Sequence, residues 1–118
     1  MTSKPNIQLR ITLSPETRLG PGKAALLQAI DETGSIAAAG RQMEMSYKRA
    51  WYLIKTMNAY FREPVVISVK GGSSRGGAQL TATGRAVLES YRSMETKAER
   101  ATARDLAKLA ALAAKKTC

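Results

Sequence analysis

The chain has 118 residues, which is enough for one domain with a modest hydrophobic core. Its 19 Lys and Arg residues outnumber its 9 Asp and Glu residues, and the formal net charge of +10 favours a polyanionic partner. Histidine is absent and the single cysteine, Cys118, is the last residue, so the common metal-ligand and nucleophile–base arrangements cannot be assembled. We therefore expect no metal site, no cofactor and no enzymatic activity. The longest run without a charged residue, 76–84, is too short to cross a bilayer, and we expect a cytoplasmic protein without membrane contact.

The first predicted element is a strand. Ile7, Leu9, Ile11 and Leu13 alternate with polar residues, which is the period of a strand with one buried face, so we expect a strand over 7–13. Turn-forming residues occupy 14–22. A first helix is predicted over 23–33, and Gly34 is expected to end it as a left-handed cap.

Two further helices are predicted close behind the first. Ser35 stands where a helix N-cap is needed, and apolar residues at helical spacing follow it, which predicts a short second helix. Its small residues, 37–40, allow a neighbouring helix to approach closely. Ser46 is a second N-cap candidate, and an apolar stripe from Ala50 to Phe61 predicts a third helix over 47–61. Trp51 is expected in the core.

A β-hairpin and a long helix complete the predicted elements. Pro64 stops the third helix, and the β-branched residues of 65–69 predict a strand that returns at 78–80 after a glycine-rich, basic loop. Thr81 or Thr83 is expected to cap a last helix that runs towards residue 116. The phase of its apolar stripe shifts, so the helix is either one rod or broken between 101 and 104.

This order of elements is that of a winged helix-turn-helix. We expect a mainly α fold with a small β-hairpin, in one domain over 1–118: a winged helix-turn-helix core over 7–83 and a long C-terminal helix over 84–117. A domain this small cannot cover such a helix alone, so we expect a dimerisation element. The alternative is a helix packed only on its own domain.

The start of the third helix carries the candidate DNA-binding residues. In helix-turn-helix proteins this end enters the major groove of duplex DNA, and hydrogen-bond donors are needed there. The planar fork of Arg49 suits a guanine edge, while Lys48 and Lys55 suit phosphates. Ser46 is either a phosphate donor or only a helix cap. Residues 41–75 hold seven basic and two acidic residues, a net charge of +5. The candidates are Ser46, Tyr47, Lys48, Arg49, Tyr52 and Lys55.

The hairpin loop is the second candidate surface. Glycines let its backbone approach a phosphate or a minor groove, and Lys70, Ser73, Ser74 and Arg75 supply donors. A flexible loop without DNA contact is the alternative. The glycine spacing does not match a nucleotide-binding P-loop.

The sequence resembles the N-terminal DNA-binding domain of the ModE-type molybdate-responsive regulators, within the LysR-like winged-helix group. The resemblance rests on the runs LGPGK (19–23), AIDETGSI (29–36), MSYKRAW (45–51) and GGAQLT (76–81), together with Gly84. It implies a homodimeric prokaryotic transcription factor with a recognition helix that begins at Ser46 and a wing over 70–79. The family usually has glycine where this chain has Glu44, so we expect Glu44 in a left-handed conformation.

The resulting hypothesis is a sequence-specific, dimeric regulator of transcription that binds double-stranded DNA. The alternative is a non-specific nucleic-acid binder, either chromosome-organising or RNA-binding. One Phe, one Trp and four Tyr residues offer little for base stacking, which disfavours a single-stranded RNA platform. Full-length members of the family continue into C-terminal molybdate-binding domains, whereas this chain stops at Cys118. We therefore expect DNA binding, and no molybdate binding by this chain.

Overall fold

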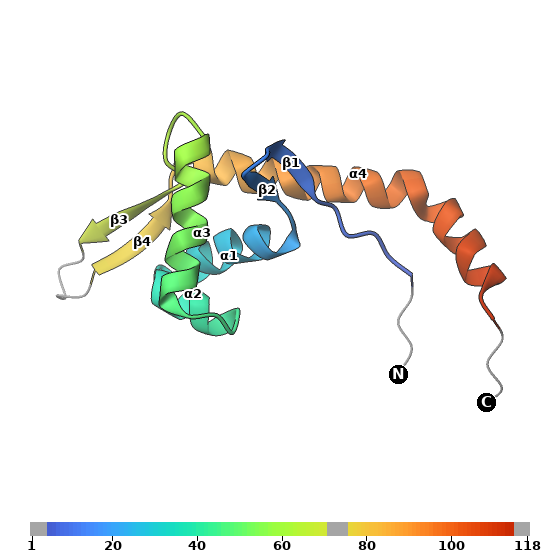
Figure 1. Ribbon diagram of the computed structural model, residues 1–118, viewed down its shortest axis with the longest axis horizontal. Helices are drawn as coiled ribbons and strands as arrows, with labels where there is room; N and C mark the ends of the chain where they lie inside the picture. Colours follow the sequence, from blue (N-terminus) through green and yellow to red (C-terminus); the bar gives the residue numbers. More distant parts are fainter. Residues whose placement is uncertain (1–4, 71–75, 115–118) are drawn as a thin grey trace.

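A long helix crosses a small helical body that carries two β-hairpins (Figure 1). The computed structural model describes residues 5–70 and 76–114. The strands are β1 (Ile11–Ser14), β2 (Thr17–Leu19), β3 (Val66–Lys70) and β4 (Gly76–Leu80). The helices are α1 (Pro21–Thr33), α2 (Ile36–Gln42), α3 (Tyr47–Tyr60) and α4 (Ala82–Leu112). The predicted fold class, mainly α with a small hairpin and a long C-terminal helix, is confirmed.

The N-terminal segment differs from its prediction. Strand pairing begins only at Ile11, so the prediction of a strand over 7–10 is wrong, and the predicted turn region contains β2. β1 and β2 pair antiparallel, with Thr12 opposite Arg18 and an irregularity before Ser14. The carbonyl of Leu9 accepts a hydrogen bond from the Tyr91 hydroxyl of α4, so tertiary contacts fix this stretch.

The predicted capping residues Gly34, Ser35 and Ser46 are confirmed, whereas α3 ends at Tyr60 rather than at 61 and α4 ends at Leu112, short of the predicted end at 116–117. Gly34 ends α1 at φ 71°, in the left-handed region that glycine adopts without strain. The side chains of Ser35 and Ser46 accept hydrogen bonds from the amides of Ala38 and Arg49, both at 3.0 Å. Pro21 occupies the first turn of α1, where its missing amide hydrogen costs nothing, so this helix starts two residues before the predicted bound.

The core lies where α1, α3, the hairpin β3–β4 and the first half of α4 meet. Its largest fully buried side chains are Tyr91, Leu26, Leu27, Ile30, Met57 and Val65. The prediction that Trp51 belongs to this core is wrong, because Trp51 is 46% exposed. Smaller and more flexible side chains of α3, Ala50 and Met57, fill the space beneath the helix.

The hairpin β3–β4 is attached to the helices by polar contacts. The side-chain oxygen of Asn58 in α3 accepts a hydrogen bond from the amide of Val65 at 2.7 Å. The amide of Ala78 donates to the carbonyl of Gly34 at 2.9 Å. These contacts fix the position of the hairpin beside α3.

Helix α4 starts against the hairpin and then leaves the body. Thr81 caps it, and the Arg85 guanidinium forms two hydrogen bonds to the Asp31 carboxylate of α1, at 3.0 and 3.2 Å. The helix is one continuous rod of 31 residues, which settles the open choice between a rod and a break. Its second half extends away from the body in Figure 1. Within the described ranges, no helix is both long and apolar enough to span a lipid bilayer.

Candidate nucleic-acid interface

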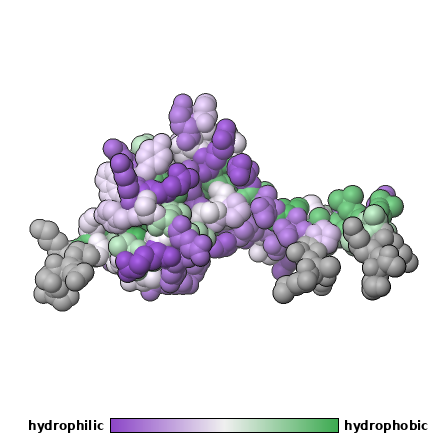
Figure 2. All heavy atoms as spheres, turned by 60° about the horizontal axis from the view of Figure 1, so that its bottom comes forward, coloured by the Kyte–Doolittle hydropathy of each residue, from purple (hydrophilic) through white to green (hydrophobic). Residues whose placement is uncertain are grey.

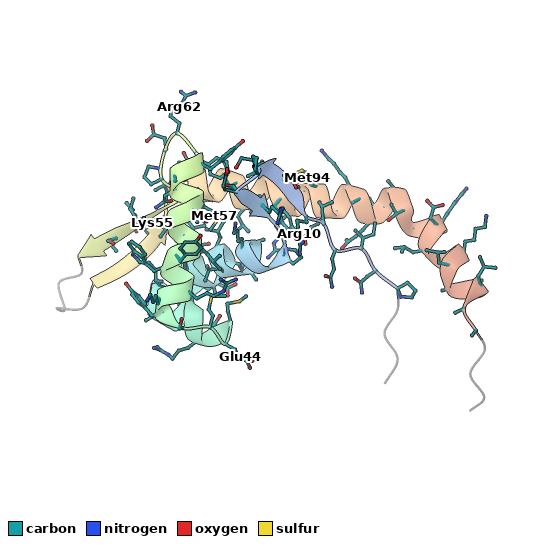
Figure 3. All side chains as sticks on the ribbon, viewed as in Figure 1. Arg10, Glu44, Lys55, Met57, Arg62 and Met94 are labelled. Carbon is teal, nitrogen blue, oxygen red and sulfur yellow. The ribbon has the colours of Figure 1, made fainter. Side chains whose placement is uncertain are left out.

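The turn between α2 and α3 sets the angle of the two helices. Glu44 lies in this turn with φ 58°, so the left-handed conformation expected there is confirmed. The amide of Met45 donates to the carbonyl of Gly40 at 2.9 Å and closes the turn. A Cβ on Gly40 would lie 3.3 Å from the Met45 carbonyl oxygen and 3.5 Å from the Ala50 Cβ, so α2 and α3 are in close contact. Glu44 is labelled at this turn in Figure 3.

The predicted residues of α3 are all exposed. Tyr47 and Tyr52 are 57% and 56% exposed, and Lys48, Arg49 and Lys55 also lie at the surface. Helical spacing places Lys48, Tyr52 and Lys55 in one outward row, with Arg49 on one flank of that row. Ser46 caps the helix, and because its hydroxyl oxygen accepts there, its hydrogen is available to a further acceptor.

Trp51 is a surface residue that the sequence interpretation had placed in the core. The ammonium of Lys55 lies 5.3 Å from the centre of the Trp51 ring, a cation–π contact that holds the lysine along the helix. Both side chains line a shallow hollow between α3 and β3, which Ile67 and Ser68 also line. The spacing of apolar residues along α3 could not predict that Trp51 is exposed, because Trp51 lies next to the buried row of Ala50, Ile54 and Met57.

The hairpin β3–β4 lies on the Trp51 side of α3. Lys70 is the last residue of β3 and pairs with Gly76 of β4. The remaining predicted wing residues, Ser73, Ser74 and Arg75, lie outside the described residues. The described hairpin therefore supplies the stem of the predicted wing, directly beside the exposed row of α3.

Three cations gather on the other flank of α3. Burial lowers the pKa of the Lys23 ammonium, and the positive charges of Arg18 and Arg49 lower that pKa further. Sequence reasoning missed Arg18 and Lys23, because they come from β2 and the first turn of α1 and meet Arg49 only in the folded chain. Across the described part of the chain, the two ion pairs, Arg85 with Asp31 and Arg92 with Glu95, involve none of these cations.

The α2–turn–α3 unit, its cationic exposed face and the adjoining hairpin define a protein of the helix-turn-helix class. Figure 2 shows hydrophilic surface over much of the body that carries this unit. The model of the bacterial regulatory helix-turn-helix proteins of the lysR family matches residues 23–85, more than half of the chain. The chain therefore belongs to this family of bacterial regulatory helix-turn-helix proteins.

Similar proteins confirm the resemblance to molybdate-responsive regulators. The molybdenum-pterin-binding protein MopB of Rhodobacter capsulatus is 44% identical over 78 residues, which cover 66% of this chain and 29% of MopB. The molybdenum transport protein ModE of Azotobacter vinelandii is 44% identical over 79 residues, which cover 67% of this chain and 29% of that protein. The matched region thus spans less than a third of either relative.

A solved structure has the same fold. The DNA-binding domain of CbnR, solved as a complex with DNA, superimposes with a TM-score of 0.56. The match covers 74% of this chain and 94% of that domain, at 24% sequence identity.

Proposed function

We propose that the chain is a sequence-specific transcriptional regulator that binds duplex DNA as a homodimer, with α3 in the major groove and the hairpin β3–β4 as a wing. The observation that carries the proposal is the exposed, cationic and acid-free face of α3, presented at the second helix of a helix-turn-helix unit. Every predicted donor from Ser46 to Lys55 lies on the surface of this segment.

Arg49 is assigned to base recognition and Lys48 and Lys55 to phosphates. The Arg49 guanidinium can donate two parallel hydrogen bonds to the O6 and N7 atoms of a guanine, which no other base edge accepts in the same way. The lysines act as point charges, and the cation–π contact with Trp51 limits the conformations open to Lys55. Ser46, Tyr47 and Tyr52 are assigned hydrogen bonds to the DNA backbone.

The wing is assigned to the backbone or the minor groove next to the site that α3 reads. Its stem is held beside α3 by Asn58, so its position relative to the recognition helix is fixed. We assign phosphate contacts to Lys70, Ser73, Ser74 and Arg75 on the basis of their chemistry and their glycine-rich surroundings.

Helix α4 is assigned to dimerisation. At about 1.5 Å per residue it extends for roughly 46 Å, well beyond the body that it packs against. Leu109 and Leu112 are 61% and 70% exposed, and green apolar surface is visible at this end of the helix in Figure 2. A hollow of about 300 Å³ beside the first half of α4 is lined largely by apolar side chains, among them Leu19, Phe61 and Met94. Both surfaces suit a second copy of the helix.

The dimer assignment is tested by the mass of the protein in solution. Leu109→Glu should convert the dimer into a monomer in sedimentation equilibrium, because it places a charge in an apolar contact. Lys108→Glu is the matched control at a neighbouring exposed position and should remain a dimer. A parent protein that is monomeric at micromolar concentration would contradict the assignment.

DNA recognition is tested by competition. A duplex selected by the parent protein from a random library should compete at least 1,000-fold better than random duplex, as specific sites of DNA-binding proteins typically do at roughly 10³ and above. Equal competition would favour the alternative of a non-specific nucleic-acid binder. Added molybdate should leave the affinity of this chain for the selected duplex unchanged, since we assign only DNA binding and dimerisation to it.

A further inference from the structure

The recognition helix lies between two β-hairpins, and only one of them is the wing. The Trp51, Lys55 and Asn58 side of α3 faces β3, whereas Tyr52, Thr56 and Tyr60 line a hollow with residues of the β1–β2 hairpin. Figure 1 shows β3 and β4 on one side of α3 and β1 and β2 on the other. The start of α1 also lies on the β1–β2 side.

The β1–β2 side carries three cations, of which Arg10 and Arg18 are exposed and Lys23 is partly buried. Along β2, Thr17 and Leu19 are buried and Arg18 is exposed, so the strand period directs Arg18 outward. Lys23 follows in the first turn of α1, and Arg10 approaches Gly20, where a Cβ would lie 3.8 Å from the Arg10 Cγ and Nε atoms. Figure 3 labels Arg10 on this side of α3 and Lys55 on the opposite side.

The Arg10 side chain lies beside Gly20, the residue between Arg18 at the middle of β2 and Lys23 in the first turn of α1, and within the described residues none of these three cations forms an ion pair. Burial lowers the pKa of the Lys23 ammonium, and the positive charges of Arg18 and Arg49 lower that pKa further. A fold gains no stability from such an arrangement. A bound anion would relieve the repulsion, and the polyanion that we propose for Arg49 is DNA.

We propose that Arg10, Arg18 and Lys23 form a second phosphate-binding flank, which holds the DNA backbone on the side of α3 away from the wing. The proposal rests on the proposed function, because it takes α3 as the element in the major groove. A major groove is bordered by two sugar-phosphate backbones. The wing and this flank lie on opposite sides of the helix, so each can contact one of them, and Arg49 lies at the border between base contacts and the flank.

The second flank supplies affinity without sequence preference. Each lysine or arginine that neutralises a phosphate releases condensed counterions, which steepens the dependence of the binding constant on salt by about 0.9 logarithmic units per contact. Contacts of this kind also fix the register of α3 along the groove. The base preference of the protein should be independent of them.

The experiment compares Arg18→Ala/Lys23→Ala with the parent on the selected duplex, over a series of salt concentrations. The double variant should reduce the salt slope by roughly two units per protomer, one for each contact, and leave the preferred bases unchanged. Ethylation of single phosphates should show which contacts are lost: interference should disappear on one border of the groove and persist on the other. The variant should melt no lower than the parent, because it removes repulsion rather than a stabilising contact.

Arg100→Ala is the matched control. Arg100 is exposed on α4, on the side opposite the row formed by Ala98, Leu106 and Leu109, so Arg100→Ala removes one positive charge far from the flank. This is half of the charge change of the double variant, so losses of salt slope are compared per charge removed. An equal loss of salt slope in Arg100→Ala would overturn the second flank in favour of a general effect of net charge. An unchanged slope in Arg18→Ala/Lys23→Ala would also overturn it, and the proposed function would stand if Lys55→Ala still weakened binding. If Lys55→Ala and Arg49→Ala had no effect either, both the flank and the proposed function would fail.

Discussion

Among the glycines of the described residues, Gly84 is the one whose replacement by alanine should destabilise the fold most. It lies in the first turn of α4, against the segment that connects α3 to β3. A Cβ there would lie 2.0 Å from the carbonyl oxygen of Val65 and 2.9 Å from its carbonyl carbon. Both atoms belong to the backbone, so Gly84→Ala forces α4 and this segment apart by more than an ångström.

The loss of folding free energy in Gly84→Ala can be derived from the hydrogen bonds that join the start of α4 to residues 64 and 65. The Thr81 amide donates to the Val65 carbonyl at 3.0 Å, and the Thr81 hydroxyl donates to the Pro64 carbonyl at 2.6 Å. Overpacking costs about 1–3 kcal/mol and each weakened hydrogen bond about 1 kcal/mol, against a gain of about 0.5–1 kcal/mol in helix propensity. We expect a net loss of about 2–4 kcal/mol, which lowers the melting temperature by roughly 10–20 °C in a domain of this size.

Thermal unfolding followed by circular dichroism measures this loss. Gly22→Ala is the matched control, because Gly22 is also in the first turn of a helix and its Cβ would meet no heavy atom within 4 Å. The control should be neutral or up to about 1 kcal/mol more stable than the parent. If Gly84→Ala has the same melting temperature as the parent, α4 does not pack closely on the Val65 segment.

Three further predictions concern the contributions of single residues to stability. Glu44→Gly should stabilise the fold by about 1 kcal/mol in urea unfolding, because it relieves a left-handed backbone, whereas Glu44→Gln should not. Asn58→Ala should cost about 1–3 kcal/mol and speed hydrogen exchange at the Val65 amide, which loses its acceptor; unchanged exchange would contradict the contact. Burial raises the pKa of the Tyr91 hydroxyl above that in the unfolded chain, so the stability it contributes is full below about pH 10 and falls as the pH rises through the folded-state pKa. The urea midpoint of the parent should therefore drop more between pH 9 and pH 11 than that of Tyr91→Phe, and equal drops would refute this cause.

The helix-turn-helix could be predicted from the sequence because its signals are local. Gly34, Ser35 and Ser46 act on amides or dihedral angles within three residues of themselves, so their roles do not depend on the rest of the fold. The expected backbone at Glu44 was also a local inference, drawn from the family resemblance.

The features that were predicted wrongly or missed depend on contacts between residues far apart in the sequence. β2 has only three residues, and its pairing depends on β1 and on the helices beneath it rather than on its own composition. Trp51 lies next to the buried Ala50 on α3, and only the positions of β3 and Lys55 show that its ring remains at the surface. Arg18 and Lys23 lie too far from Arg49 in sequence for any pattern to join them.

The most direct test of the central claim is the base preference of Arg49→Ala. The parent and the variant would each select duplexes from the same random library, with Arg100→Ala as the control. We predict that Arg49→Ala loses about 1–3 kcal/mol of binding free energy and its preference for guanine at one position of each half-site, while the remaining positions and the control are unchanged. If Arg49→Ala selects the same bases with the same affinity as the parent, α3 does not read DNA through Arg49 and the assignment of the recognition helix is wrong.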